Sequence, residues 1–375
     1  MAQTSFAFDD LLALRSADAS QWPACSSARL GVADADFQTG YGIGWDHARH
    51  GLLPPQRHLL PGNPLRQGWQ AGRGAFASRT RPATEEVRTW LRLRVEAWEQ
   101  GLVFEDLLVT PHFLKQLATA RCPVTRELLT EGARVVRLNQ AAGYAAGNLT
   151  LLSPRAAQVL PGLTGPSARE SGRLATTAVD GLSRGLNAAE WARLACLVDM
   201  ATPLDHETAA QQPLRALPPN RVRVLNAIQG LQVWLTLQME LEGWSQRLNR
   251  LAERLPETSR LAFRVFVGGF LPRVWQDGRP ADAEALKQRL EDAWADERVL
   301  SRWQHFALQL SAGQTERLLS DALALGVSGR RMQQHAASGA TDGWALESGG
   351  QAEWRLRARP QFRPMLRRKF STASV

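Results

Sequence analysis

The chain has 375 residues, 44% of them hydrophobic, and a net charge of +9. This length allows two or more domains, because single cores rarely grow past roughly 250 to 300 residues. The longest apolar run, residues 265–271, is far shorter than the roughly 20 residues that cross a bilayer, which excludes a membrane-spanning helix. Asp9 and Asp10 stand where a secretory leader would be basic, so we expect a cytoplasmic protein.

Cysteine and histidine usage gives no metal-binding pattern. Cys25, Cys122 and Cys196 are odd in number and contain no Cys-x-x-Cys pair, which argues against a disulfide framework and a thiolate zinc site. His47 and His50 are three residues apart, but no carboxylate pattern accompanies them. We therefore predict no metal and no cofactor.

The first predicted segment, residues 1–82, is rich in glycine, proline and aromatic residues. Glycine and proline recur too often for long helices, so we predict irregular structure there. The next, residues 83–160, begins with a predicted helix behind Thr84, because apolar residues recur there every three or four positions. A second short helix is expected after Pro111, which suits a first helical position.

Residues 122–158 form the most distinctive pattern in the chain. A turn at "CPVT" precedes a short apolar strand "RVVRL", a turn "NQAAGYAAGN", a second strand "LTLLS" and a helical "PRAAQ". The sequence therefore predicts a β-hairpin followed by a helix, which we call the finger.

The frame of the finger resembles the ββα-metal, or HNH, fingers of endonucleases, particularly the bacterial and phage variants. Those variants read Cys-Pro, then Asp-His or Asp-Arg, then Gly-Tyr, then Gly-Asn-Leu, then Asn. The matching frame residues here are Cys122 with Pro123, Gly143, Tyr144, and Asn148 within "GNL". The resemblance implies hydrolysis of a phosphodiester by a histidine and a divalent ion.

The finger departs from this family at the catalytic positions. Val136 and Arg137 stand where Asp-His is expected, and Gln158 ends the helix where Asn or His is expected. Arginine cannot act as a general base, and one amide without a carboxylate holds magnesium poorly. We therefore predict no catalytic residue. Two alternatives stay open, phosphate binding by Arg134, Arg137 and Arg155, or a structural role with Asn148 in a turn and Tyr144 in a core.

The chain after the finger divides into three predicted parts. Residues 161–185 contain "PGLTGPSARESG" and are predicted to be a linker, and residues 186–340 a helical domain. Apolar stripes predict one helix that ends before Pro256 and another that runs from about residue 281 to 310. The fold class predicted for the whole chain is mainly α, with helical bundles and a small embedded ββα finger.

A helix-turn-helix candidate lies at residues 315–338. Ala322 precedes Gly326 by four residues, as small contact and turn residues do in such motifs. Arg330, Arg331 and Gln334 would then face DNA. The alternative is an ordinary pair of helices joined by a glycine.

The positive charge is concentrated in the second part of the predicted tail, residues 341–375. Residues 351–375 hold seven basic residues against Glu353 alone, which is +6. The leading expectation is a non-enzymatic protein that binds nucleic acid, DNA in particular, in a bacterial or mobile-element setting. The alternatives are a helical scaffold that binds proteins through tryptophan-rich stripes, and a metal-dependent endonuclease with a rebuilt site. We expect no membrane partner.

Overall fold

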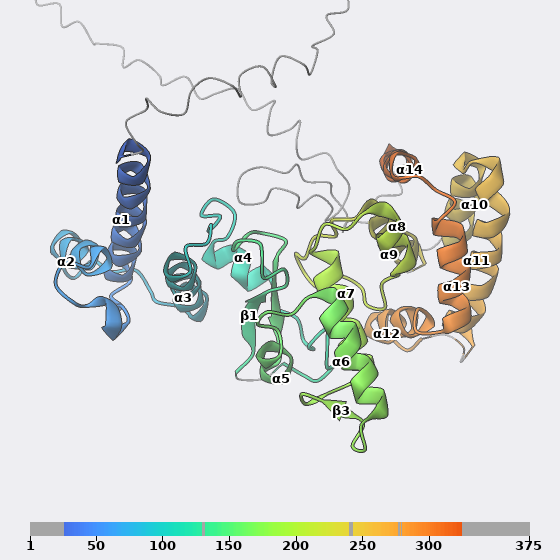
Figure 1. Ribbon diagram of the computed structural model, residues 1–375, viewed down its shortest axis with the longest axis horizontal. Coiled ribbons are helices and arrows are strands. Elements are labelled where there is room, and N and C mark those ends of the chain that lie inside the picture. Colours follow the sequence, from blue (N-terminus) through green and yellow to red (C-terminus); the bar gives the residue numbers. More distant parts are fainter. Residues whose placement is uncertain (1–25, 130–131, 240–242, 277, 279, 325–375) are drawn as a thin grey trace, which may run out of the picture. The chain divides into compact units, whose positions relative to one another are not determined.

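The computed structural model describes residues 26–129, 132–239, 243–276, 278 and 280–324. Contacts divide the chain into two units, Met1–Ala83 and Thr84–Val375. In the described residues, α-helices dominate and the strands form two small two-stranded sheets (Figure 1). The prediction of a mainly helical fold with a small ββ element is therefore confirmed. Within these described ranges, no helix combines the length and apolarity that a bilayer crossing requires.

The first unit contains α1 (Ser26–Arg49), the 3-10 helix η3 (Gln56–His58) and α2 (Pro64–Phe76). The prediction of irregular structure over residues 1–82 is wrong for these segments. The glycines that look like helix breakers instead allow two helices to touch. A Cβ on Gly44 would overlap the carbonyl oxygen of Leu65, and one on Gly68 would overlap that of Tyr41. These glycines therefore indicate close packing of α1 against α2.

The histidines of this unit have packing roles. His47 is buried, and its Nδ1 lies 2.8 Å from the carbonyl oxygen of Ile43, one helical turn earlier. His58 is buried as well.

The second unit begins with α3 (Glu85–Glu99), whose first turn is capped by Thr84, and α4 (Pro111–Gln116), capped by Thr110. Both helices were predicted, and both are confirmed. The predicted finger hairpin and its helix are also confirmed. β1 (Arg134–Arg137) pairs antiparallel with β2 (Leu149–Leu152), and α5 (Pro154–Gln158) follows.

Residues 161–185 are not a linker. α6 (Gly165–Thr177) begins with a reciprocal cap between Thr164 and Ser167, so "TGPS" is a helix start rather than a loop. A two-residue hairpin of β3 (Leu182–Ser183) and β4 (Leu186–Asn187) then leads into α7 (Ala188–Met200). α6 and α7 lie side by side (Figure 1).

The remaining helices complete one core with the finger. They are α8 (His206–Gln211), α9 (Ala227–Gln238), α10 (Trp244–Arg254), α11 (Glu257–Trp275), α12 (Ala283–Ala293), α13 (Glu297–Ala307) and α14 (Ala312–Ala324). α9 is buried along nearly its whole length. The single helix predicted over residues 281–310 is wrong, because the carboxylate of Asp296 accepts hydrogen bonds from the backbone of Arg298 and Val299 and starts α13.

Two of the tryptophans in the C-terminal half, where a protein-binding stripe was predicted, are core residues, whereas Trp244 at the start of α10 is partly buried. Trp294 and Trp303 are buried and lie 5.4 Å apart between ring centroids, in a cluster with Phe266, Phe270 and Phe306. Burial of these aromatic rings is a major source of apolar stabilisation.

Candidate functional site

The hairpin of the finger lies between two hydrophobic clusters. Tyr144, Ala146 and Leu149 pack with α3 and α4, whereas Leu138 and Leu152 pack into the large core formed by the later helices. Both faces of the hairpin are therefore used for packing, and this explains why its polar residues make internal contacts.

Asn148, which matches a polar position of the HNH frame, is fully buried and binds backbone groups. Its Nδ2 donates to the carbonyl oxygens of Asn139 (3.1 Å) and Gly143 (3.0 Å), and its Oδ1 accepts from the backbone N–H of Asn139 (2.8 Å). These three bonds close the loop between β1 and β2. Both Nδ2 hydrogens and one of the two acceptor sites of Oδ1 are used in this arrangement, and the residue is closed off from solvent.

The other frame residues also make internal contacts. A Cβ on Gly143 would overlap the carbonyl oxygen of Val103, and the ring of the buried Tyr144 lies against Phe104. Cys122 is buried, and its Sγ accepts a hydrogen bond from the backbone of Ser153. Burial acts to raise the pKa of the Cys122 thiol, but hydrogen bonds from Ser153 and Thr125 outweigh it and lower the pKa below its ordinary value.

Arg137, one of the predicted phosphate ligands, is turned inward. Its guanidinium donates to the carbonyl oxygens of Gln140 (2.9 Å) and Ala142 (2.7 Å) and to Oε1 of Gln100 (3.0 Å). It also lies 4.6 Å from the centroid of the Tyr144 ring. These contacts hold the hairpin loop against α3, a structural role.

Arg155 makes internal contacts but stays partly exposed. It pairs with Glu127 at 2.9 Å and with the buried Glu190 at 2.5 Å, and it donates to the carbonyl oxygen of Gly185. Its side chain is still 41% exposed. The two carboxylates neutralise its charge, so a phosphate would have to compete with them.

Two other arginines, one in the finger and one in the hairpin that Arg155 contacts, are exposed. Arg134 faces Leu152 across the hairpin, three residues before Arg155. Arg184 lies in the turn between β3 and β4, next to the carbonyl group that Arg155 contacts. Among the described residues, neither guanidinium pairs with a carboxylate. Arg134 was predicted from the sequence as a phosphate ligand, but Arg184 was not. The surroundings of Arg184 depend on the fold of residues that were predicted to be a linker.

The predicted DNA-reading residues Arg330, Arg331 and Gln334 lie outside the described residues, as does the basic tail. The part of the helix-turn-helix candidate that is described, residues 315–324, lies in α14. Thr315, Leu318 and Leu319 are buried there. In the described ranges, His, Cys, Asp and Glu side chains form no group of three or more that could hold a metal ion.

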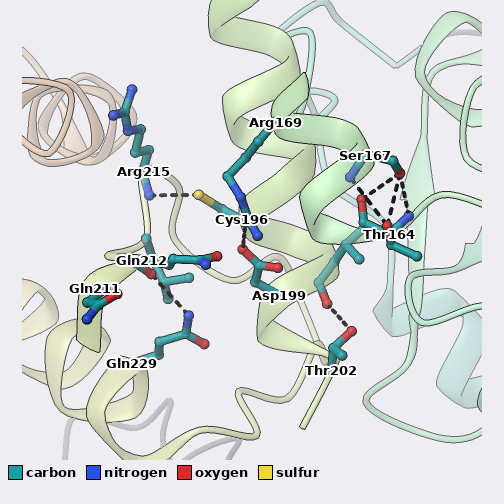
Figure 2. Close-up of polar contacts among 12 residues, drawn as sticks. Thr164, Ser167, Arg169, Cys196, Asp199, Thr202, Gln211, Gln212, Arg215 and Gln229 are labelled. Atoms are coloured by element: carbon teal, nitrogen blue, oxygen red, sulfur yellow. Dashed lines mark hydrogen bonds and ion pairs between the residues drawn. The ribbon is translucent and has the colours of Figure 1, made fainter. Parts of the chain in front are cut away.

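A second feature, which the sequence did not predict, is a cavity of about 350 Å³. α6, α7, α13 and the segment at the end of α8 line it. Its lining includes small residues of α6 and α7, among them Gly172 and Ala192. Figure 2 shows Arg169, Cys196, Asp199, Gln212 and Arg215 around it.

The charged groups of this cavity are unevenly paired. Arg169 pairs with the buried Asp199 at 2.5 Å, and the backbone N–H of Arg215 donates to Sγ of Cys196 at 3.1 Å (Figure 2). Burial raises the pKa of Asp199 despite its pairing with Arg169. Burial also raises the pKa of Cys196 to about 11, so the thiol stays protonated at neutral pH.

Comparison with known proteins adds no relative, since no family model, curated protein or solved structure matches this chain.

Proposed function

We propose that this chain binds nucleic acid, without cutting it, through the finger and the basic segment near its C-terminus, and that it acts in the cytoplasm. The proposal rests on two exposed arginines, Arg134 in β1 of the finger and Arg184 in the turn between β3 and β4, next to the carbonyl group that Arg155 contacts. Neither has a carboxylate partner among the described residues, so both are available to phosphate oxygens.

The basic segment adds the long-range attraction. Residues 351–375 contribute +6 of the net charge and interleave three aromatic residues, Trp354, Phe362 and Phe370, with arginine. Such segments attract phosphate backbones and offer rings on which bases stack. The resemblance to phage and bacterial HNH fingers agrees with an origin near mobile DNA, and DNA is the nucleic acid we propose.

The residues of the finger support binding without cutting. The positions that match the family's metal ligands and general base hold Val136, Arg137 and Gln158. The surviving Asn148 is fully buried and makes three hydrogen bonds to backbone groups. A hydrolytic water would have neither a base nor a metal ion to activate it there.

Binding of a labelled DNA duplex, measured by fluorescence anisotropy between about 50 and about 200 mM salt, tests the proposal. The double variant Arg134→Ala, Arg184→Ala should reduce the slope of log K against log salt by roughly 0.9 for each phosphate that the variant no longer neutralises. The matched control is Arg250→Ala, Arg264→Ala, which removes two exposed arginines from α10 and α11. Equal slopes for both double variants would exclude the finger from the interface.

A protein partner is the second candidate, and an exposed apolar strip on α11 favours it. Leu261 is 72% exposed and Val265, one turn later, is 48% exposed. Salt separates the candidates, because apolar association is much less salt-dependent than phosphate binding. Complex formation that survives high salt and is abolished in Leu261→Ser would favour the protein partner.

A further inference from the structure

The cavity beside α6 and α7 has the size and shape of a site for a small molecule. Its volume of about 350 Å³ falls within the roughly 300 to 1,000 Å³ of typical ligand pockets. Its walls come from four separate segments, so a bound molecule would contact α6, α7, α13 and the residues after α8 together.

The lining carries more positive than negative charge. Arg169, Arg173 and Arg215 line the cavity, whereas Asp199 is the carboxylate that lines it. Asp199 is occupied by Arg169, and Arg173 is paired with Glu170, an exposed residue outside the lining. Arg215 has no carboxylate partner among the described residues. This excess charge favours an anionic group in the cavity.

A second, independent feature indicates a hydrogen-bond donor on the ligand. Oε1 of Gln212 is buried at the cavity wall and has no hydrogen-bond partner among the described residues. A carbonyl oxygen buried without a donor is costly, so a ligand hydroxyl or amine at this point would be stabilised. The described lining residues include no aromatic side chain, and its apolar part is aliphatic, with Leu300 and Pro213. This described lining therefore offers no aromatic ring on which a nucleobase would stack.

We propose that this cavity binds a small, hydroxylated, aliphatic organic anion. Arg215 and Arg173 would bind its carboxylate or phosphate oxygens, and Oε1 of Gln212 would accept a hydrogen bond from one of its hydroxyl groups. The ion pair of Arg169 with Asp199 holds the wall between α6 and α7. Arg134, Arg137 and Arg155 of the finger do not line this cavity, so its test is independent of the test for DNA binding.

Isothermal titration calorimetry of the full chain with citrate, glucose 6-phosphate and glucose tests this site. Citrate offers carboxylates and a hydroxyl, glucose 6-phosphate offers a phosphate and hydroxyls, and glucose is its neutral counterpart. We expect at least one of the two anions to bind and glucose to give no heat. The anion that binds distinguishes a carboxylate site from a phosphate site.

Variants locate the binding. Arg215→Gln should weaken the binding of that anion at least tenfold, because it removes a charge-assisted hydrogen bond. Arg250→Gln, which removes an exposed charge from α10, should leave the affinity unchanged. Ala192→Leu should also abolish binding by filling the cavity, with near-ultraviolet circular dichroism as the check that the core is intact.

Three results would overturn the proposal. The first is absence of binding by both anions up to about 10 mM, a concentration well above the dissociation constants of functional metabolite sites. The second is equal weakening by Arg215→Gln and Arg250→Gln, which would indicate a general charge effect. The third is binding of glucose as tight as that of glucose 6-phosphate, which would show that the anionic group does not contribute to binding.

Discussion

The amide of Asn148 satisfies three backbone groups that the loop between the finger strands would otherwise leave unpaired. Asn148→Ala should lower the free energy of unfolding by about 2–4 kcal/mol, because buried backbone groups lose their partners. The check is urea denaturation, with Asn249→Ala, an exposed change in α10, as the control. A decrease below about 0.5 kcal/mol, within the range of surface substitutions, would contradict the structural role of Asn148.

Glu291 of α12 links three parts of the second unit. It accepts hydrogen bonds from the backbone of Leu217 and from Arg126 of the finger. Burial raises the pKa of Glu291 above 4.5. This effect outweighs the opposite effect of Lys287, Leu217 and Arg126, which lower the pKa. The folded state therefore holds this proton more tightly than the unfolded state, and the protein loses stability from this group as the pH rises above 4.5.

Glu291→Gln removes that proton-binding site. As the pH rises from 4.5 through the raised pKa, the natural protein loses stability from this group and the variant does not. The free energy of unfolding of the variant should therefore rise relative to that of the natural protein. Urea denaturation of both proteins across this pH window measures the difference. A difference that stays constant with pH, or that grows in favour of the natural protein, would contradict the assignment.

Residue identity alone could not place the side chains of the finger. Alternation along β1 puts Arg134 and Val136 on one face and Val135 and Arg137 on the other. The sequence predicted this strand, but whether Arg137 meets solvent depends on the path of the loop that brings the carbonyl groups of Gln140 and Ala142 to it. The structural alternative for Asn148 and Tyr144 could be stated from the sequence, whereas the inward turn of Arg137 could not.

At the scale of elements, the packing of α1 on α2 depends on glycine. Gly68→Ala should destabilise this pair by about 1–3 kcal/mol, because the new Cβ would overlap the backbone of Tyr41. Gly74→Ala, in the same helix, meets nothing within 4 Å and should stabilise α2 by about 0.5–1 kcal/mol.

Hydrogen exchange measured by mass spectrometry on peptides from α1 and α2 compares these two variants. Faster exchange in Gly68→Ala and slower exchange in Gly74→Ala is the expected pair of results. Similar behaviour of both variants would show that close contact at Gly68 does not hold the helices together.

The elements that the sequence predicted correctly have local signals. α3 begins at a threonine cap and keeps its apolar period, and the finger has turn residues between short apolar strands. The elements that it missed depend on partners distant in the sequence. Gly44 and Gly68 suit helices only because the two helices meet, and Thr164 caps a helix that packs on α7. Small residues such as Ala192 give no sign of a cavity until the facing helix is known.

At the scale of the molecule, the finger is the centre of the second unit. Its residues contribute to both of that unit's hydrophobic clusters, and Arg126 joins it to α12. Substitutions in its frame should therefore affect the stability of the whole unit. Arg134 of the finger and the neighbouring hairpin residue Arg184 stay exposed, and these are the residues that we propose to contact phosphate.

We propose that the chain binds DNA and does not cut it. The most direct test of this proposal is incubation of supercoiled plasmid with the full chain in the presence of magnesium, manganese or EDTA, followed by electrophoresis before and after removal of the protein. We predict retarded migration that is reversed by salt, and plasmid that remains supercoiled under all three conditions. Nicked or linear plasmid that forms only with a divalent ion, or an absence of retardation at low salt, would contradict the account.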